Sequence, residues 1–250
     1  KQFDKCNIKC GKFEVRVIEN RGRDVSALLV GAADLVSRYD IFCYAHDKKS
    51  SYMLPESVGE VWSDKLFECN LTSREFVQNL INEFAANDYL GLTLAPLAHH
   101  ADYFFLLGGK HNWVDNLKPT TALLKLLGVH NYLPKRSIPL FAPLGSMFWA
   151  RTDAVRKIFD KGWQYEDFPP EPLPPDASIS HAIERVWAYL AQDAGYYSLV
   201  TIPDNYFSTE FSALAHYLHE ILAICADNKV SFGAPKVMAS SVRDLLGGNH

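Results

Sequence analysis

The stretch from Phe13 to Ser51 limits the possible folds more than any other part of the 250-residue chain. Apolar and polar residues alternate from Phe13 to Val17, and the β-branched content up to Ile18 predicts a strand. A charged break follows, and behind Asp24, a good N-cap residue, apolar residues recur at helical spacing. Tyr39 to Ala45 is a second short apolar run. The order strand, loop, helix, strand predicts an α/β fold.

Clusters of mostly polar and charged residues follow each of these two strands. They are Asn20, Arg21, Gly22, Arg23 and Asp24 after the first strand, and His46, Asp47, Lys48 and Lys49 after the second. In an open α/β sheet, ligands bind outside the carboxyl ends of the strands, and arginine makes paired hydrogen bonds with phosphate oxygens. We therefore expect a phosphate-bearing ligand here. The alternative is that the acids only pair with the neighbouring cations.

A second group of site residues is expected in a proline-rich loop. Residues 165–176, YEDFPPEPLPPD, contain five prolines and four carboxylates. Proline restricts the backbone, so the loop is predicted to be stiff and extended. Glu171 or Asp176 in such a loop could deprotonate a hydroxyl group as a general base. The competing interpretation of Asp176 is an ordinary N-cap of the helix predicted to start near Ala177.

The helix predicted from Ser178 to about Asp193 has three polar residues within one turn. His181 and Arg185 share a face, and Glu184 is adjacent, so they form either part of a site or a solvated face. A second helix is predicted from Ser208 to Ala226, where His216 and His219 are interpreted as surface residues.

Composition and charge exclude several classes of protein. The net charge of −4 argues against broad nucleic-acid binding, which needs clustered cations. No run of about 18 apolar residues is present, so no membrane span is expected. Five scattered cysteines favour a reducing compartment. We expect a cytoplasmic protein, at most peripherally associated with a membrane.

Four sequence blocks resemble one known family. They are NRGRD at 20–24, YDIFCYAHDKKS at 39–50, FAPLGSMFWARTDA at 141–154 and FPPEPLPPDASISHAIERVWAYLAQDAGYY at 168–197. Together they resemble the rhamnan synthesis F family of bacterial polysaccharide glycosyltransferases, over roughly residues 13–205.

The resemblance implies a fold of the GT-A-like nucleotide-sugar type. Its sheet would be mixed but mostly parallel, and flanked by helices. Residues 1–206 would form the glycosyltransferase domain, and residues 207–250 a C-terminal helical extension packed on the same domain. The first nucleotide-binding strand is not recognisable, so either it precedes residue 1 in the parent protein or this family builds the site differently.

The function implied by the resemblance is an inverting rhamnosyltransferase. Its donor would be dTDP-L-rhamnose or a related nucleotide sugar, and its acceptor a growing glycan or lipid-linked glycan. Asp176, Glu171, Glu184 and His181 would be the catalytic candidates, and Gly145, Ser146 and Trp149 would lie near the acceptor sugar.

Metal dependence is an open point of this interpretation. Many GT-A enzymes hold Mg²⁺ or Mn²⁺ with an Asp-x-Asp pair, but here the strand end offers only Asp47. Asp47 could still hold such a cation together with diphosphate oxygens and water, or cationic side chains could replace the metal. The competing function is a non-catalytic domain that binds a glycan or nucleotide sugar within a larger assembly protein.

Overall fold

The structure is a computed structural model that describes residues 12–47, 57–96, 113–136, 140–174 and 176–228. Its centre is a four-stranded sheet in the order β1-β3-β2-β4. The strands are β1 (Ile41–Tyr44), β2 (Leu90–Leu94), β3 (Phe148–Arg151) and β4 (Tyr197–Val200). The α/β class and the mixed sheet flanked by helices are confirmed.

The prediction of a mostly parallel sheet is wrong. Strand β3 pairs antiparallel with both β1 and β2, and only β2 and β4 form a parallel pair. Strands β1, β2 and β4 nevertheless run in one direction, because β3 is inserted between β1 and β2 with the opposite direction. A strand buried on both faces reads as a continuous buried run, which is typical of parallel sheets, so the pattern of β3 did not reveal this insertion.

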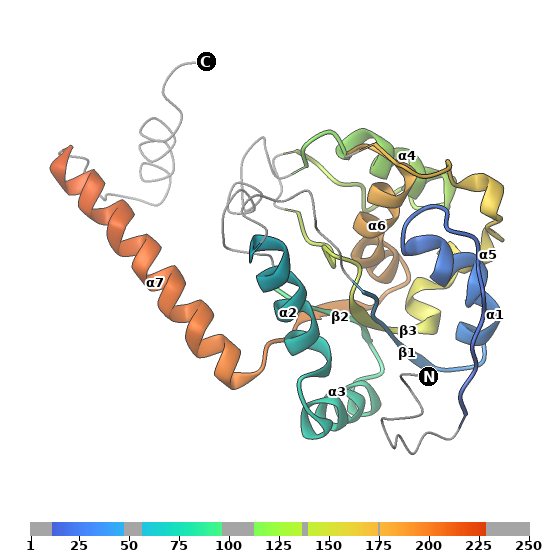
Figure 1. Ribbon diagram of the computed structural model, residues 1–250, viewed down its shortest axis with the longest axis horizontal. Coiled ribbons are helices and arrows are strands. Elements are labelled where there is room, and N and C mark those ends of the chain that lie inside the picture. Colours follow the sequence, from blue (N-terminus) through green and yellow to red (C-terminus); the bar gives the residue numbers. More distant parts are fainter. Residues whose placement is uncertain (1–11, 48–56, 97–112, 137–139, 175, 229–250) are drawn as a thin grey trace.

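Helices cover both faces of the sheet (Figure 1). One face carries α2 (Ser57–Leu71) and α3 (Arg74–Ala86), and the other carries α4 (Leu117–Leu126) and α6 (Ile179–Asp193). The short elements are a π-helix at Ala27–Gly31, α1 (Ala33–Val36), a 3₁₀-helix at Thr152–Val155, α5 (Arg156–Asp160) and a 3₁₀-helix at Tyr165–Asp167.

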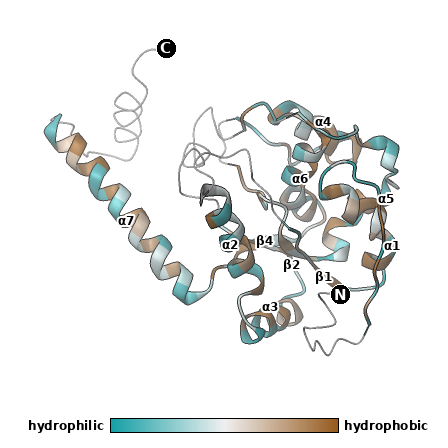
Figure 2. Ribbon diagram, viewed as in Figure 1, coloured by the Kyte–Doolittle hydropathy of each residue, from teal (hydrophilic) through white to brown (hydrophobic). Residues whose placement is uncertain are grey.

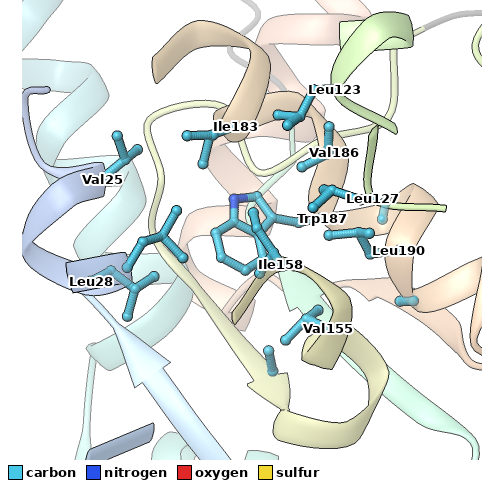
Figure 3. Packing of buried hydrophobic residues seen from close by; sticks show 14 of the residues in the cluster. Val25, Leu28, Leu123, Leu127, Val155, Ile158, Ile183, Val186, Trp187 and Leu190 are labelled. Carbon is cyan, nitrogen blue, oxygen red and sulfur yellow. The ribbon is translucent and has the colours of Figure 1, made fainter. Parts of the chain in front are cut away.

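The main core lies between the sheet and α6. Successive side chains of a strand point to opposite faces, so Phe148 and Ala150 face α6 while Trp149 faces α3. Trp187 of α6 lies in the middle of the main cluster (Figure 3), with its ring 4.7 Å from that of Phe148. The alternation within β3 therefore fills both layers and fixes the side of the sheet that α6 covers.

The expected first strand, Phe13 to Ile18, is not a strand in the structure. The segment has no strand partner among the described residues, and its side chains are exposed, to 98% for Val17. Arg16 holds the segment against the following helices, because its guanidinium donates to the Gly31 carbonyl oxygen and to the Asp34 carboxylate. The alternating pattern here follows an extended surface segment rather than a paired strand.

The long helix α7 (Asp204–Asp227) projects from the body of the molecule (Figure 1). Its start is tied to α2 by buried Lys65, whose ammonium lies 2.5 Å from the Glu210 carboxylate. Hydrophobic and hydrophilic residues alternate along it (Figure 2), and Phe211 is 62% exposed. The domain division at residue 206 stays a prediction. Among the described helices, none is both long and apolar enough to cross a membrane.

Candidate functional site

The antiparallel direction of β3 brings the expected ligand-binding segments together. Tyr44 at the end of β1 is opposite Phe148 at the start of β3, so the turn before β3 lies beside the residues that follow β1. His46 Nε2 is 2.8 Å from the Gly145 carbonyl oxygen and 3.6 Å from Asp24 Oδ2. The Tyr44 hydroxyl donates to the Asp24 carbonyl oxygen at 2.7 Å. Three separate parts of the chain therefore meet at this sheet edge.

The arginine-containing loop at 20–24 is joined to the proline-rich loop. Arg21 Nε donates to the Phe168 carbonyl oxygen at 2.5 Å, and the backbones of Arg21 and Pro170 form an isolated β-bridge. The backbone N–H of Arg23 donates to Glu171 Oε1 at 2.8 Å. Because these contacts involve mostly main-chain groups, the two loops, far apart in the sequence, form one structural unit.

Gly22 lies at the closest approach of these two loops. Its φ of +70° is in the left-handed region, and a Cβ atom there would lie 2.6 Å from the Phe168 ring. Its carbonyl oxygen accepts a hydrogen bond from buried Ser180 Oγ at 2.9 Å. The position therefore requires glycine both for its backbone conformation and for space.

We expect Gly22→Ala to destabilise the protein more than Gly128→Ala does. Gly128 has a similar φ of +77°, but a Cβ atom there would meet nothing within 4 Å in the part of the chain that the structure describes. Both variants carry the cost of a left-handed alanine, on the order of 1–3 kcal/mol. Only Gly22→Ala adds overpacking against Phe168, about 1–3 kcal/mol more. Urea denaturation of both variants measures the difference, and equal losses of stability would contradict the close contact.

Arg23 reaches from this loop to the start of α6. Its Nη1 is 3.1 Å from His181 Nε2, and its Nη2 donates to the Pro174 carbonyl oxygen at 3.2 Å. Burial and the neighbouring Arg23 charge lower the pKa of His181, with a smaller opposing effect of Glu184. The histidine is therefore mostly neutral at pH 7.

Glu184 links α6 to the turn before β3. Its Oε1 accepts from the backbone N–H of Gly145 at 2.7 Å, and its Oε2 accepts from Arg185 Nη1 at 2.7 Å. Gly145 and Ser146 both have positive φ, of +90° and +56°, and Arg185 is only 6% exposed. The Glu184 carboxylate thus balances a buried cation and holds a turn of unusual conformation.

Two other carboxylates of the site are also held through both of their oxygens. Asp176 accepts from the Asn116 side chain and from the backbone N–H of Asp115, and Glu171 Oε2 accepts from the backbone N–H of Leu173 in addition to its bond with Arg23. Burial raises the pKa of Asp176, but the hydrogen bonds outweigh it and the net shift is downward. Asp176 is therefore ionised at neutral pH but a weak base.

Asp24 differs from these carboxylates. Its Oδ2 is 3.5 Å from the Tyr44 hydroxyl and 3.6 Å from His46 Nε2, and its Oδ1 has no hydrogen bond within the described part of the chain. The side chain is 19% exposed at the sheet edge. The oxygens of Asp24 are therefore held more loosely than those of Glu171, Asp176 and Glu184.

Most of the predicted site residues converge on this edge, but not all of them do. The structure brings together Arg21, Gly22, Arg23, Asp24, His46, Gly145, Glu171, His181 and Glu184, with exposed Asn20 and Asp47 next to them in the chain. Trp149 lies elsewhere, buried against α3, with its indole N–H donating to the Asn70 carbonyl oxygen at 3.1 Å. Lys48 and Lys49 lie outside the described residues.

The structure also assigns contacts that sequence reasoning missed. Ser178, rather than Asp176, is the N-cap of α6: its Oγ accepts from the backbone N–H of His181 at 3.4 Å. The motif Ser-x-x-His resembles a capping box with histidine in place of glutamate, a signal that could have been noticed. Nothing in the sequence relates Asn116 to Asp176, because they are 60 residues apart.

The donor set for a metal is incomplete in the described part of the chain. No group of three or more His, Cys, Asp or Glu side chains there is arranged to hold a metal ion. Asp47 is exposed and offers one carboxylate. A hard cation would need oxygens from the ligand or water to complete its coordination. The described side chains alone do not complete the coordination of a resident Mg²⁺ or Mn²⁺.

Comparison with known proteins identifies the family. The family model described as rhamnan synthesis protein F matches residues 4–196. The chain belongs to the rhamnan synthesis protein F family. This confirms the resemblance and places the chain in a family of polysaccharide synthesis. The match includes both joined loops, the turn before β3 and α6.

Two curated relatives of this family member come from Xanthomonas campestris pv. campestris. Both are called uncharacterized protein WxcX, one from strain B100 and one from strain ATCC 33913, and each is 30% identical over 186 residues. The match covers 74% of this chain but 25% of each relative, so the chain spans about a quarter of their length. No solved structure matches the chain.

Proposed function

We propose that the chain is the glycosyltransferase portion of a rhamnan synthesis F protein, with a GT-A-like site. It would move L-rhamnose or a related sugar from a nucleotide diphosphate donor to a glycan or lipid-linked glycan. The observation that supports this most directly is the position of Arg23, whose guanidinium lies at the sheet edge where α/β proteins bind phosphate-bearing ligands.

In this proposal the leaving diphosphate binds to the cationic side chains of the joined loops. Arginine donates paired hydrogen bonds to phosphate oxygens and stabilises the negative charge that grows as the bond to the sugar breaks. Arg23 is the first candidate, with Arg21, Lys48 and Lys49 as further cations and His46 and Asp47 beside them. Mg²⁺ or Mn²⁺ at Asp47 is a separate proposal, for which the donor itself would supply the remaining ligands.

Transfer with inversion needs one carboxylate as general base. The acceptor oxygen attacks the anomeric carbon, its proton passes to the carboxylate, and the nucleoside diphosphate leaves with the electrons of the broken bond. Asp176 is the base that the sequence favours, but its two oxygens accept hydrogen bonds that weaken it. We therefore add Asp24 as a second candidate, because it has an oxygen without a hydrogen bond in the described structure.

Two measurements on the purified chain test the proposal. Calorimetric titration with dTDP-L-rhamnose, with and without Mn²⁺ or Mg²⁺, should show binding, and a transfer assay should release dTDP. Asp24→Asn and Asp176→Asn should both spare donor binding, and the variant that loses transfer at least about 100-fold identifies the base. If no nucleotide sugar binds, the proposed function is wrong.

A non-catalytic binding domain is the second candidate. The observation that favours it is the saturation of Glu171, Asp176 and Glu184 by hydrogen bonds, which is typical of structural carboxylates. The same two measurements separate the candidates, because a binding domain would bind the donor without releasing dTDP in the presence of any acceptor. In either case we propose a location at the cytoplasmic face of the membrane, where nucleotide sugars and lipid-linked acceptors meet.

A further inference from the structure

The contact between Arg23 and His181 determines which ring nitrogen of the histidine carries its proton. A guanidinium has only N–H donors, so His181 Nε2, at 3.1 Å from Arg23 Nη1, can make this contact only through its lone pair. A neutral imidazole must then carry its hydrogen on Nδ1. That atom is 2.7 Å from Ser178 Oγ, a suitable acceptor. The backbone N–H of Ser178 also points at Nδ1, as in a capping box, but at 3.4 Å. The Nδ1–H tautomer gives up this longer contact and keeps the shorter, charge-assisted one to Arg23.

We propose that His181 is a positioning residue that holds Arg23 only while its imidazole is neutral, and that Ser178 selects the required tautomer. A protonated ring would direct an N–H group at the guanidinium and place two cations about 3 Å apart. The Arg23 guanidinium would then lose its contact with α6, and the hydrogen bond to the Pro174 carbonyl oxygen would remain. Ser178 thus has two tasks, since it also caps α6.

The charges around His181 favour the neutral ring. Arg23 from the joined loops and Arg185 from α6 both oppose a positive ring, while Glu184 from α6 and Asp176 from the proline-rich loop favour it. Burial adds to the effect of the arginines, and the net result is a lowered pKa. The contact is therefore complete above the ordinary histidine pKa of about 6.5 and is lost as the pH falls through the lower folded-state pKa.

This inference deepens the proposed function and rests on it for its consequence. If Arg23 binds the donor diphosphate, protonation of His181 releases Arg23 from its position and weakens donor binding. We therefore expect the affinity for dTDP-L-rhamnose to fall at acidic pH, with a midpoint at the pKa of His181. His181 would act through Arg23 rather than on the reacting atoms, which replaces the catalytic role predicted for it.

Nitrogen NMR of the histidine rings tests the contact without any ligand. The full chain, labelled at its imidazole nitrogens, should show His181 as the Nδ1–H tautomer with a pKa below 6.5. In Arg23→Ala, the loss of the neighbouring cation should raise that pKa. The Nε2–H tautomer in the wild type, or an unchanged His181 pKa in Arg23→Ala, would overturn the proposal. Neither readout depends on donor binding, so they separate this inference from the proposed function.

Calorimetric titration with dTDP-L-rhamnose between pH 5 and 8 tests the consequence. In His181→Gln, the glutamine places an acceptor oxygen near the position of Nε2 but does not titrate. The loss of dTDP-L-rhamnose affinity at acidic pH should therefore disappear. His181→Phe should bind about 10-fold more weakly at all pH values, because the loss of one hydrogen bond to a charged group corresponds to about that factor. The control His130→Gln changes an exposed histidine outside the site and should keep the acid fall.

Variants of Ser178 test the tautomer. Aspartate is also a good N-cap, so Ser178→Asp keeps α6 capped but places a carboxylate against Nδ1. This charge favours the protonated ring, and the acid fall in affinity should move to higher pH. Ser178→Thr keeps a hydroxyl and should leave the pH midpoint of the affinity loss as in the wild type. An unshifted midpoint in Ser178→Asp, or an acid fall that persists in His181→Gln, would contradict the proposal.

Discussion

Arg23→Ala is expected to weaken binding of dTDP-L-rhamnose by about 10- to 100-fold. A hydrogen bond to a charged group contributes about 1.5–3 kcal/mol, and each 1.4 kcal/mol corresponds to a factor of ten. The substitution is informative because the loop contact through the backbone N–H of Arg23 to Glu171 remains possible in the variant. The measurement is calorimetric titration at pH 8, where His181 is neutral.

Two further substitutions make this result specific. Arg156→Ala removes an exposed arginine of α5 that pairs only with nearby Asp153 among the described residues, so donor binding should not change. Arg23→Lys keeps the charge but not the planar fork of donors, and should recover only part of the affinity. Equal affinities for wild type and Arg23→Ala would show that other cations bind the diphosphate.

Glu184→Ala is expected to reduce the free energy of unfolding by about 3–5 kcal/mol, the usual effect of removing one partner of a buried ion pair. Arg185 is 6% exposed, and its Nε already lacks a hydrogen-bond partner within the described structure. Loss of the carboxylate would leave this cation buried without its counter-charge. The turn at Gly145 would also lose the acceptor of its backbone N–H. Urea denaturation at neutral pH measures the change.

Asp153→Ala is the matched control, because Asp153 also pairs with an arginine close in sequence. The side chains of Asp153 and Arg156 are more than half exposed, so solvent screens their attraction and stability should hardly change. A loss in Glu184→Ala as small as that in the control would contradict the structural role assigned to Glu184. Full stability together with lost transfer would instead support its predicted catalytic role.

The local features of this fold could be predicted from the sequence. The sequence predicts a helix from Ser178 to about Asp193, within one residue of the observed bounds Ile179–Asp193, because its apolar stripe and the following Gly195 are clear signals. The loops at 20–24 and 165–176 were also expected at one site. The family resemblance, rather than composition, assigns both loops to one site. Composition indicates only that arginines in a polar loop and carboxylates among prolines are typical of binding loops rather than of a core.

The long-range features could not be predicted in this way. The direction of β3 depends on the path of the chain before it, and no residue of the strand records that path. Phe13 to Ile18 has the pattern of a strand, but a strand also requires a partner, and the pattern does not provide one. The sequence likewise predicts carboxylates that are available as bases, because it does not show which distant donors bind them. Their hydrogen-bond donors, such as Asn116, come from distant segments.

The fluorescence of Trp163 depends on the packing beneath the joined loops. Trp163 stacks on Phe168 with ring centroids 5.3 Å apart, and its indole N–H donates to the Ile158 carbonyl oxygen at 2.7 Å. The emission of a buried indole depends on the groups around it. The carbonyl group of Phe168 holds Arg21, so an arginine that turns toward a bound phosphate disturbs the neighbour of the tryptophan. If Arg21 binds phosphate as proposed, the fluorescence of Trp163, one of five tryptophans in the chain, is expected to change with the state of this loop.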